Sequence, residues 1–146
     1  MIKNARHVGF VVQDIKKSLH FYKDFLGLNI WKQDTEIGPY IDNVVGIKDV
    51  KIEWIKLQSK DGFLIELLQY HSHPESPSKQ TFIPSNKLHS AHVAFTVDNL
   101  DKVYSKLTKN NYHCNSKPQH SPNGLVKVLY CHDPDGISVE LVEELK

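Results

Sequence analysis

The chain has 146 residues, of which 40% are hydrophobic, and a chain of this length buries enough surface to fold as one compact body. Its 18 Lys and Arg nearly balance its 17 Asp and Glu, and no block of like charges supports a nucleic-acid surface or a basic membrane patch. No apolar run approaches the roughly 20 residues of a bilayer span, and the N-terminus lacks the apolar core of a signal peptide, so we expect a cytoplasmic protein. Two cysteines, Cys114 and Cys131, are too few for a disulfide scaffold, and we expect both to be reduced and to lie in strands.

An internal repeat organises the sequence. Residues 7–15 and 92–100 share His, Val, Phe and Val at matching positions, and residues 61–68 and 135–142 share an Asp-Gly pair followed by Glu-Leu. Because the two matches come in the same order, the chain consists of two copies of one module of about 60 to 70 residues. We therefore expect a single domain over residues 1–146, divided into three parts: a first module at about 1–70, a linker at about 71–87 and a second module at about 88–146.

The first copy predicts the order βαβββ. Alternating apolar residues predict a strand over residues 5–12, and Asp14 can cap a following helix, whose apolar residues recur at helical spacing until Gly27 ends it. Three further strands are expected at residues 28–32, 51–58 and 63–70. The insertion over residues 34–50 is expected to form a loop or a short helix, and long loops of this kind often carry function.

The second copy predicts the same order. A strand over residues 91–97 precedes a helix over about 100–109, which Asp98 or Asn99 can cap. The remaining strands are expected at residues 112–116, 125–131 and 137–143. The linker carries three prolines among polar residues, which is typical of an extended connection. The pattern as a whole predicts an α+β fold of two βαβββ modules.

Four residues that recur in the two copies are candidates for a metal site. Glu66 and Glu140 each interrupt an otherwise apolar strand, where a carboxylate is costly unless it is paired, protonated or bound to a metal. His7 and His92 stand in the first strand of each copy, with small neighbours that leave room beside them. Two imidazoles and two carboxylates suit a divalent metal ion such as Zn, Ni, Co, Mn or Fe, with positions left for water or substrate. The alternative is that the histidines are half-buried strand residues and that the carboxylates face solvent from edge strands.

Four motifs recur around the candidate residues: HVGFVVQD at His7, Asp-Gly with Ile-Glu-Leu at Glu66, AHVAFTVDNLD at His92 and DPDGISVEL at Glu140. Together they resemble the vicinal oxygen chelate superfamily, which includes glyoxalase, methylmalonyl-CoA epimerase, extradiol dioxygenases, fosfomycin-resistance transferases and bleomycin-binding proteins. The similarity covers essentially the whole chain. The resemblance implies curved mixed sheets around a metal, with these four residues as its ligands. It also implies a homodimer, in which the four ligands come from one chain or from two.

The ligand order His, Glu, His, Glu resembles that of glyoxalase and is close to that of methylmalonyl-CoA epimerase. The resemblance implies a lyase or isomerase that moves a carbon-bound proton of a small substrate whose vicinal oxygens chelate the metal. By analogy with glyoxalase, Glu140 is the first candidate for the catalytic base and Glu66 the second. Two alternatives stay open: an extradiol-type iron dioxygenase, and a metal-free protein that binds a small molecule such as an antibiotic.

A few other residues have two possible roles each. Three aromatic residues fall in predicted strands, where they either line a pocket or pack in the core: Trp54, Tyr70 and Tyr130. His71 and His73 are either a metal site of their own or two exposed loop residues. The chain lacks the basic residues and the long insertion expected for glutathione recognition, so the sequence leaves the substrate open.

Overall fold

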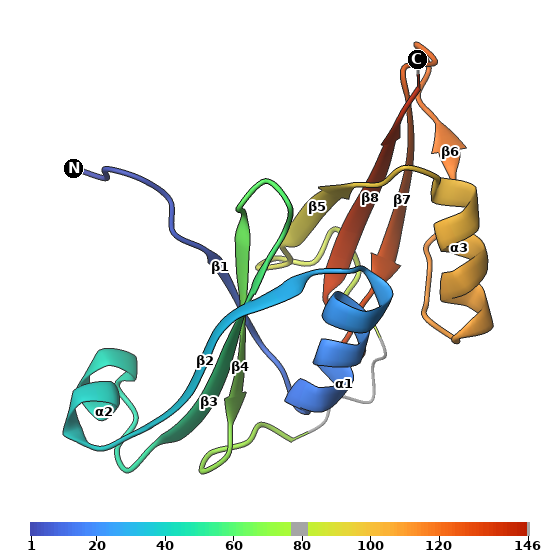
Figure 1. Cartoon of the computed structure of the whole chain (residues 1–146). Coiled ribbons are helices and arrows are strands. Elements are labelled where there is room, and N and C mark those ends of the chain that lie inside the picture. The colour runs from blue at the N-terminus through green and yellow to red at the C-terminus, as the bar shows by residue number, and fades with distance from the viewer. Residues whose placement is uncertain (77–81, 146) are drawn as a thin grey trace. The chain divides into compact units, whose positions relative to one another are not determined.

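The computed structural model describes residues 1–76 and 82–145 of the chain (Figure 1). The chain divides into two compact units, Met1–Pro77 and Ser78–Lys146, and each unit carries one four-stranded mixed sheet. Part of the predicted linker, residues 77–81, lies outside the described residues. The expectation that both modules form one domain stays a prediction.

The first unit has the predicted order βαβββ with one added helix. Its elements are β1 (Val8–Val11), α1 (Ile15–Leu19), the π-helical turn η1 (His20–Phe25), β2 (Asn29–Ile37), α2 (Pro39–Val45), β3 (Lys51–Gln58) and β4 (Leu64–Tyr70). The strand order in the sheet is β1-β4-β3-β2, with β1 parallel to β4 and the other pairs antiparallel. The last strand of the unit therefore lies inside the sheet, beside the first.

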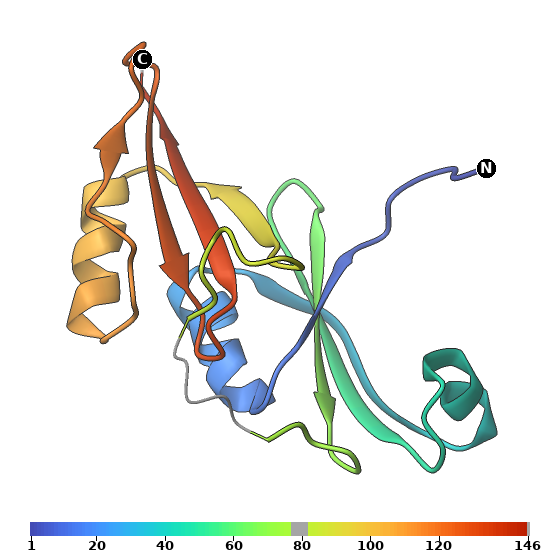
Figure 2. The ribbon, with the colours of Figure 1, turned by 180° about the vertical axis from the view of Figure 1, so that it is seen from behind.

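The second unit repeats this topology. Its elements are β5 (His92–Thr96), α3 (Leu100–Lys109), β6 (Gln119–His120), β7 (Val126–His132) and β8 (Ser138–Glu144). The strand order is β5-β8-β7-β6, and β5 runs parallel to β8 as β1 does to β4. Helix α3 packs against β7 and β8 (Figure 2).

The two faces of each sheet have different roles, because side chains alternate along a strand. In the first unit, Ile55, Leu57 and Leu67 are almost completely buried, as are Phe21 and Tyr22 of η1. In the second unit the corresponding core consists of Leu100, Leu107, Leu129, Cys131, Val139 and Leu141. The residues between these core positions point to the opposite face, where both candidate glutamates lie.

The start of each main helix is held by a capping residue and by a side chain from the strand that carries the glutamate. Asp14 accepts hydrogen bonds from the amides of residues 16 and 17, and Asn99 accepts one from that of residue 102, so Asn99 and not Asp98 is the second cap. The side chain of Gln69 accepts from the Ile15 amide in the first unit, and Glu143 accepts from the Leu100 amide in the second. Each helix start is thereby tied to the last strand of its unit.

Two predicted elements differ from the structure. The strand expected at 28–32 continues to Ile37, because it pairs with β3 as far as the partners Ile37 and Lys51, and the expected insertion is reduced to α2 and its flanking turns. The strand expected at 112–116 is wrong. Only Cys114 forms a bridge to Cys131, and bends at residues 115–117 interrupt the pairing before β6 resumes it.

Both thiols are free, and burial raises the pKa of Cys114 to about 11 and that of Cys131 to about 12. They are therefore poor nucleophiles at neutral pH. Cys131 lies in β7 as expected, whereas Cys114 is only partly buried and forms an isolated bridge outside the named strands. In the described part of the chain, no helix is both long and apolar enough to cross a membrane.

Candidate functional site

In the first unit, His7 and Glu66 meet on the face of the sheet opposite its helix. His7 immediately precedes β1, and Glu66 lies on β4 beside Gly9 of β1. The Nε2 atom of His7 is 2.8 Å from Oε2 of Glu66, whose side chain is only 13% exposed. A Cβ atom placed on Gly9 would lie 3.9 Å from that same Oε2 and 3.2 Å from Cδ1 of Leu68, so the glycine keeps space open beside the carboxylate.

A lysine contacts the other carboxylate oxygen of Glu66. Lys56 stands directly opposite Glu66 across β3 and β4, and its Nζ is 3.3 Å from Oε1. The same ammonium lies 4.9 Å from the ring centroid of Trp54, a distance at which a cation is attracted to the indole face. Trp54 is itself held by a 3.1 Å hydrogen bond from its Nε1 to Glu36. The first carboxylate is therefore held at both oxygens, by an imidazole and by an ammonium.

In the second unit, His92 and Glu140 meet in the same way. His92 opens β5, and Glu140 lies on β8 beside Ala94. The Nε2 atom of His92 is 3.1 Å from Oε2 of Glu140, and the two side chains are 47% and 21% exposed. This pair is more accessible to solvent than its counterpart, in which His7 is 26% exposed.

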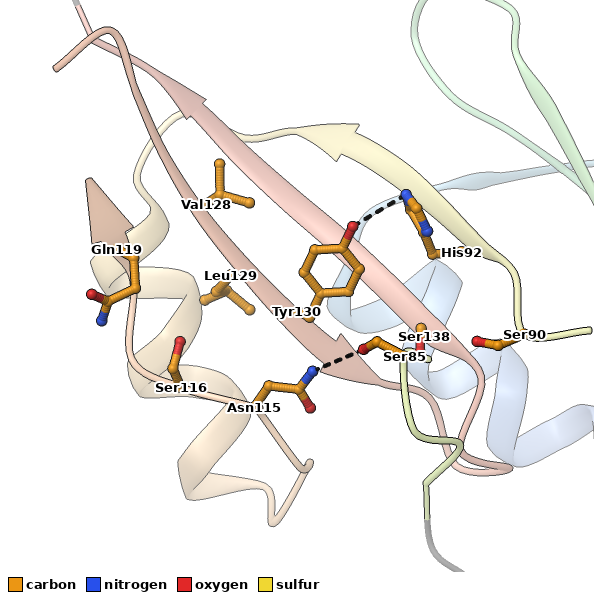
Figure 3. A pocket seen from close by; sticks show the side chains of 10 residues that line it. All are labelled: Ser85, Ser90, His92, Asn115, Ser116, Gln119, Val128, Leu129, Tyr130 and Ser138. Atoms are coloured by element: carbon orange, nitrogen blue, oxygen red, sulfur yellow. Dashed lines mark hydrogen bonds between the residues drawn. The ribbon is translucent and has the colours of Figure 1, made fainter. Parts of the chain in front are cut away.

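The residue that faces Glu140 is a tyrosine instead of a lysine. Tyr130 is the cross-strand partner of Glu140, and its hydroxyl donates to Oε2 at 2.9 Å. The hydroxyl oxygen also lies 3.2 Å from Nε2 of His92, as Figure 3 shows. Burial and the neighbouring carboxylate raise the pKa of Tyr130, so the phenol stays protonated at neutral pH. The second pair is thus completed by a neutral hydroxyl.

The structure brings each predicted histidine together with the glutamate of its own unit. The two pairs, His7 with Glu66 and His92 with Glu140, occupy equivalent positions of the repeat. Within the described residues, neither unit by itself groups three or more His, Cys, Asp or Glu side chains as a metal site would require. That all four residues bind one ion stays a prediction. The alternative with both carboxylates on edge strands is wrong, because β4 and β8 lie inside their sheets.

A cavity of about 430 Å³ opens on the same face of the second unit, beside the His92 pair. Tyr130 and His92 form part of its wall, and Ser138 lies next to them on β8 (Figure 3). The Ser138 side chain is 3% exposed, and in the described structure its Oγ is buried without a hydrogen-bond partner. A buried hydroxyl without a partner costs about 1–3 kcal/mol.

Sequence analysis missed the roles of Lys56 and Ser138. A signal for Lys56 was present, because Lys56 and Tyr130 each stand ten residues before their glutamate and therefore at matching places of the repeat. No sequence signal identifies Ser138, since its lack of a partner is a property of the folded structure. Of the two roles considered for the strand aromatics, Tyr130 has the first, because it lines the cavity. Trp54 is buried.

The other two candidate histidines, His71 and His73, follow the end of β4. His71 is exposed, and its Nε2 is paired with Oε2 of Glu53 at 2.8 Å. Nδ1 of His73 contacts the hydroxyl of Ser72. These two histidines are therefore exposed residues with separate partners, and they do not form a metal site of their own in the described structure.

Comparison with known proteins agrees with this architecture. The sequence profile of the Glyoxalase/Bleomycin resistance protein/Dioxygenase superfamily matches residues 5–141. The chain is 25% identical over 144 residues to the uncharacterized protein YaeR of Escherichia coli (strain K12), with 98% of each chain covered. A crystal structure of a glyoxalase family protein from Bacillus cereus has a TM-score of 0.86 and 27% identity and covers 100% of this chain and 99% of its own.

A more distant structure shares only the fold. The fosfomycin resistance protein FosX from Listeria monocytogenes, in a complex with Mn(II) and sulfate, has a TM-score of 0.61 at 13% identity, with 99% of this chain and 95% of that chain covered. The profile match spans nearly the whole sequence, and the chain belongs to the Glyoxalase/Bleomycin resistance protein/Dioxygenase superfamily. The two βαβββ units predicted from the repeat are the fold of this family.

Proposed function

We propose that this protein is a metal-dependent lyase or isomerase of the glyoxalase and epimerase type, which moves a carbon-bound proton of a small substrate with two vicinal oxygens. The observation that carries the proposal is the repeated pair: the same imidazole and carboxylate meet at equivalent positions of both sheets, 2.8 Å apart in one unit and 3.1 Å in the other. Both pairs lie on the sheet face opposite the buried core of their unit, where an imidazole and a carboxylate can bind a ligand.

The donor atoms of each pair fit a shared divalent ion. Metal–nitrogen and metal–oxygen bonds of about 2.0–2.2 Å at a right angle separate two donors by about 3 Å, which is the separation within both pairs. We propose that His7, Glu66, His92 and Glu140 together hold one Zn, Ni, Co, Mn or Fe ion, within one chain or across a homodimer. The FosX protein of the same fold was crystallised with Mn(II), which supports a divalent ion. Such an ion, when bound, supplies Lewis-acid stabilisation of negative charge on substrate oxygens.

The surroundings of the two glutamates favour Glu140 as the base that removes the substrate proton. Both oxygens of Glu66 are engaged, one by His7 and the other by Lys56. The contacts of Glu140 with His92 and Tyr130 both use Oε2, and its unit holds the cavity that can admit a substrate. Glu66 is the second candidate for the base, and in this proposal its main role is to hold the ion.

Proton exchange tests the proposed activity directly. Dihydroxyacetone carries a carbonyl and a hydroxyl on neighbouring carbons, and its C–H protons exchange for deuterium when a base removes them. We expect protein loaded with Mn(II) or Zn(II) to accelerate this exchange in D2O, followed by NMR, and we expect metal-free protein not to do so. Equal exchange with and without metal would contradict the proposal, and uptake of oxygen with an iron-loaded protein would instead favour a dioxygenase.

A metal-free binding protein is the second candidate, and Lys56 is the observation that favours it. An ammonium 3.3 Å from Oε1 of Glu66 already neutralises a carboxylate that a metal ion would otherwise bind. In that case the same fold binds a small molecule such as an antibiotic without turnover. The candidate predicts that His7→Ala leaves the binding of this molecule unchanged, whereas the enzyme requires His7 for metal binding.

A further inference from the structure

The cavity of the second unit presents uncharged hydrogen-bonding groups together with apolar surface from Val128 and Leu129. Hydroxyl and carboxamide side chains from four separate segments converge on it: Ser85, Ser90, Asn115, Ser116, Gln119 and Ser138 (Figure 3). Among the described residues, no Asp, Glu, Lys or Arg lines this space. A cavity that bound a phosphate or a carboxylate would be expected to present a cation, and one that bound a hydrocarbon would not present so many hydroxyls.

Ser138 gives an independent indication that this cavity is a binding site. Its side chain is 3% exposed, and its Oγ is a buried polar atom without a hydrogen-bond partner in the described structure. Native structures nearly always satisfy such groups, with protein atoms, water or a ligand. The fold does not require a hydroxyl here, because the matching position of the first unit is Leu64.

Neighbouring contacts hold the polar wall in place. Asn115 contacts Nε2 of the buried His132 at 2.8 Å, and its Nδ2 donates to the hydroxyl of Ser85 at 3.4 Å. The hydroxyl of Tyr130, another lining residue, is held by Glu140. Groups that are fixed in this way select a ligand by the positions of its oxygens, because they cannot rearrange freely around another molecule.

We infer that this cavity binds an uncharged small molecule with several hydroxyl and carbonyl oxygens, such as a ketose, and that Ser138 Oγ hydrogen-bonds one of those oxygens. The inference rests on the proposed function, because such a molecule supplies the vicinal oxygens that the reaction needs. It goes further by assigning the substrate to a neutral class and by naming Ser138 as a specificity-determining residue. Without bound metal, no Lys or Arg among the described lining residues can pair with a phosphate or a carboxylate, and the lining imidazole of His92 is engaged by Glu140, so phosphorylated and carboxylated analogues should bind more weakly.

The test uses the full chain in a metal-free buffer with a chelator, so that binding is read without metal. Dihydroxyacetone and D-fructose are titrated against their phosphate esters, dihydroxyacetone phosphate and D-fructose 6-phosphate, and amide chemical shifts are followed by NMR. We expect saturable shifts at Ser138, Asn115 and Tyr130 with the neutral sugars and weaker binding of both phosphate esters. Tighter binding of the esters, or no saturable shift with either sugar, would overturn the inference.

Two serine variants separate recognition from folding. Ser138→Ala should raise the dissociation constant roughly fivefold, the loss of one neutral hydrogen bond. It should also raise the melting temperature of the free protein, since it removes a buried hydroxyl without a partner. Ser105→Ala on the exposed face of α3 is the matched control and should change neither quantity. An unchanged dissociation constant in Ser138→Ala would overturn the role of this residue.

Failure of the inference is distinguishable from failure of the proposed function. If neutral sugars bind in the cavity but no metal-dependent proton exchange occurs, the cavity assignment holds and the proposed reaction fails. If metal-dependent exchange occurs while the cavity residues show no shift with either sugar, the reaction holds and the cavity assignment fails.

Discussion

The two units of the chain share a topology, a register and a His–Glu pair, and they differ in the residue that faces the glutamate. Lys56 holds the first glutamate with a charge, whereas Tyr130 holds the second with a neutral hydroxyl beside a cavity. The backbone frame of the repeat is therefore the same in both units, while the chemistry of the face is not. This difference indicates a division of roles, in which the first unit mainly holds a metal and the second also receives the substrate.

Replacing one glutamate at a time should have the largest effect on activity. Glu140→Gln removes the proposed base, and we expect metal-dependent exchange of dihydroxyacetone protons to fall about 10²- to 10⁴-fold. Glu66→Gln should lower the exchange mainly by weakening metal binding, so that a higher metal concentration restores part of it. Initial rates by NMR over a metal titration compare the two. If saturating metal restored the Glu140→Gln variant and not the Glu66→Gln variant, the assigned roles would be reversed.

The core of each unit can be weakened at matching positions. Leu67 and Leu141 are completely buried at equivalent places on β4 and β8, and replacing either with Ala should lower the free energy of unfolding by about 2–5 kcal/mol. We expect both variants to shift the same single transition in urea, because the sequence predicts one domain. Two transitions, each shifted by only one of the variants, would instead mean that the units unfold separately.

Removing the lysine tests why the two pairs differ. Lys56→Met takes a cation away from Glu66, and we expect it to tighten the binding of Zn(II) about tenfold, equivalent to about 1.4 kcal/mol. Tyr130→Phe is the matched change in the second unit, and because it removes no charge it should alter metal affinity much less. Calorimetric titration measures both constants. Equal effects of the two variants would show that the charge of Lys56 does not matter to the metal site.

The smallest effect concerns the residues that tie each helix to its sheet. The Leu100 amide and Lys127 hold the pKa of Glu143 below its usual value of 4.5, so the folded state favours the ionised carboxylate. This stabilisation is present above pH 4.5 and is lost as the pH falls through the lowered pKa. Glu143→Gln resembles Gln69 of the first unit and should lower the melting temperature slightly at pH 7.

The pH dependence provides the control for that variant. The difference in melting temperature between wild type and Glu143→Gln should disappear at a pH below the lowered pKa of Glu143, where the native carboxyl is protonated. A difference that stays constant from pH 7 to pH 3 would mean that the charge of Glu143 contributes nothing, and that only the shape of the side chain matters.

The repeat made much of the fold predictable. The strand over residues 51–58 and the helix over 100–109 have the predicted bounds, because alternation and helical spacing are clear there. The strand predicted at 112–116 was wrong because local composition favoured pairing, whereas the chain bends after a single bridge at Cys114. Such a bend depends on contacts with β7 that a local sequence window does not contain.

The candidate site was predictable in its chemistry and less so in its surroundings. The recurrence of His7 and Glu66 as His92 and Glu140 identified both pairs, since each carboxylate interrupts an apolar strand. The contact between Lys56 and Glu66 depends on which residues stand opposite each other across a hairpin, and this follows from the register and not from composition. Whether the four residues act together is a question about the assembled protein in solution.

Metal stoichiometry tests the central claim, that the two pairs bind one ion together. Full-length protein without a histidine tag is dialysed against Mn(II) or Zn(II), and bound metal is measured by elemental analysis for the wild type and for the variants His7→Ala and Glu140→Ala. We predict one ion per chain in the wild type and loss of that ion in either variant, although each variant alters only one pair. No bound ion, or two ions per chain of which each variant removes only one, would contradict the claim.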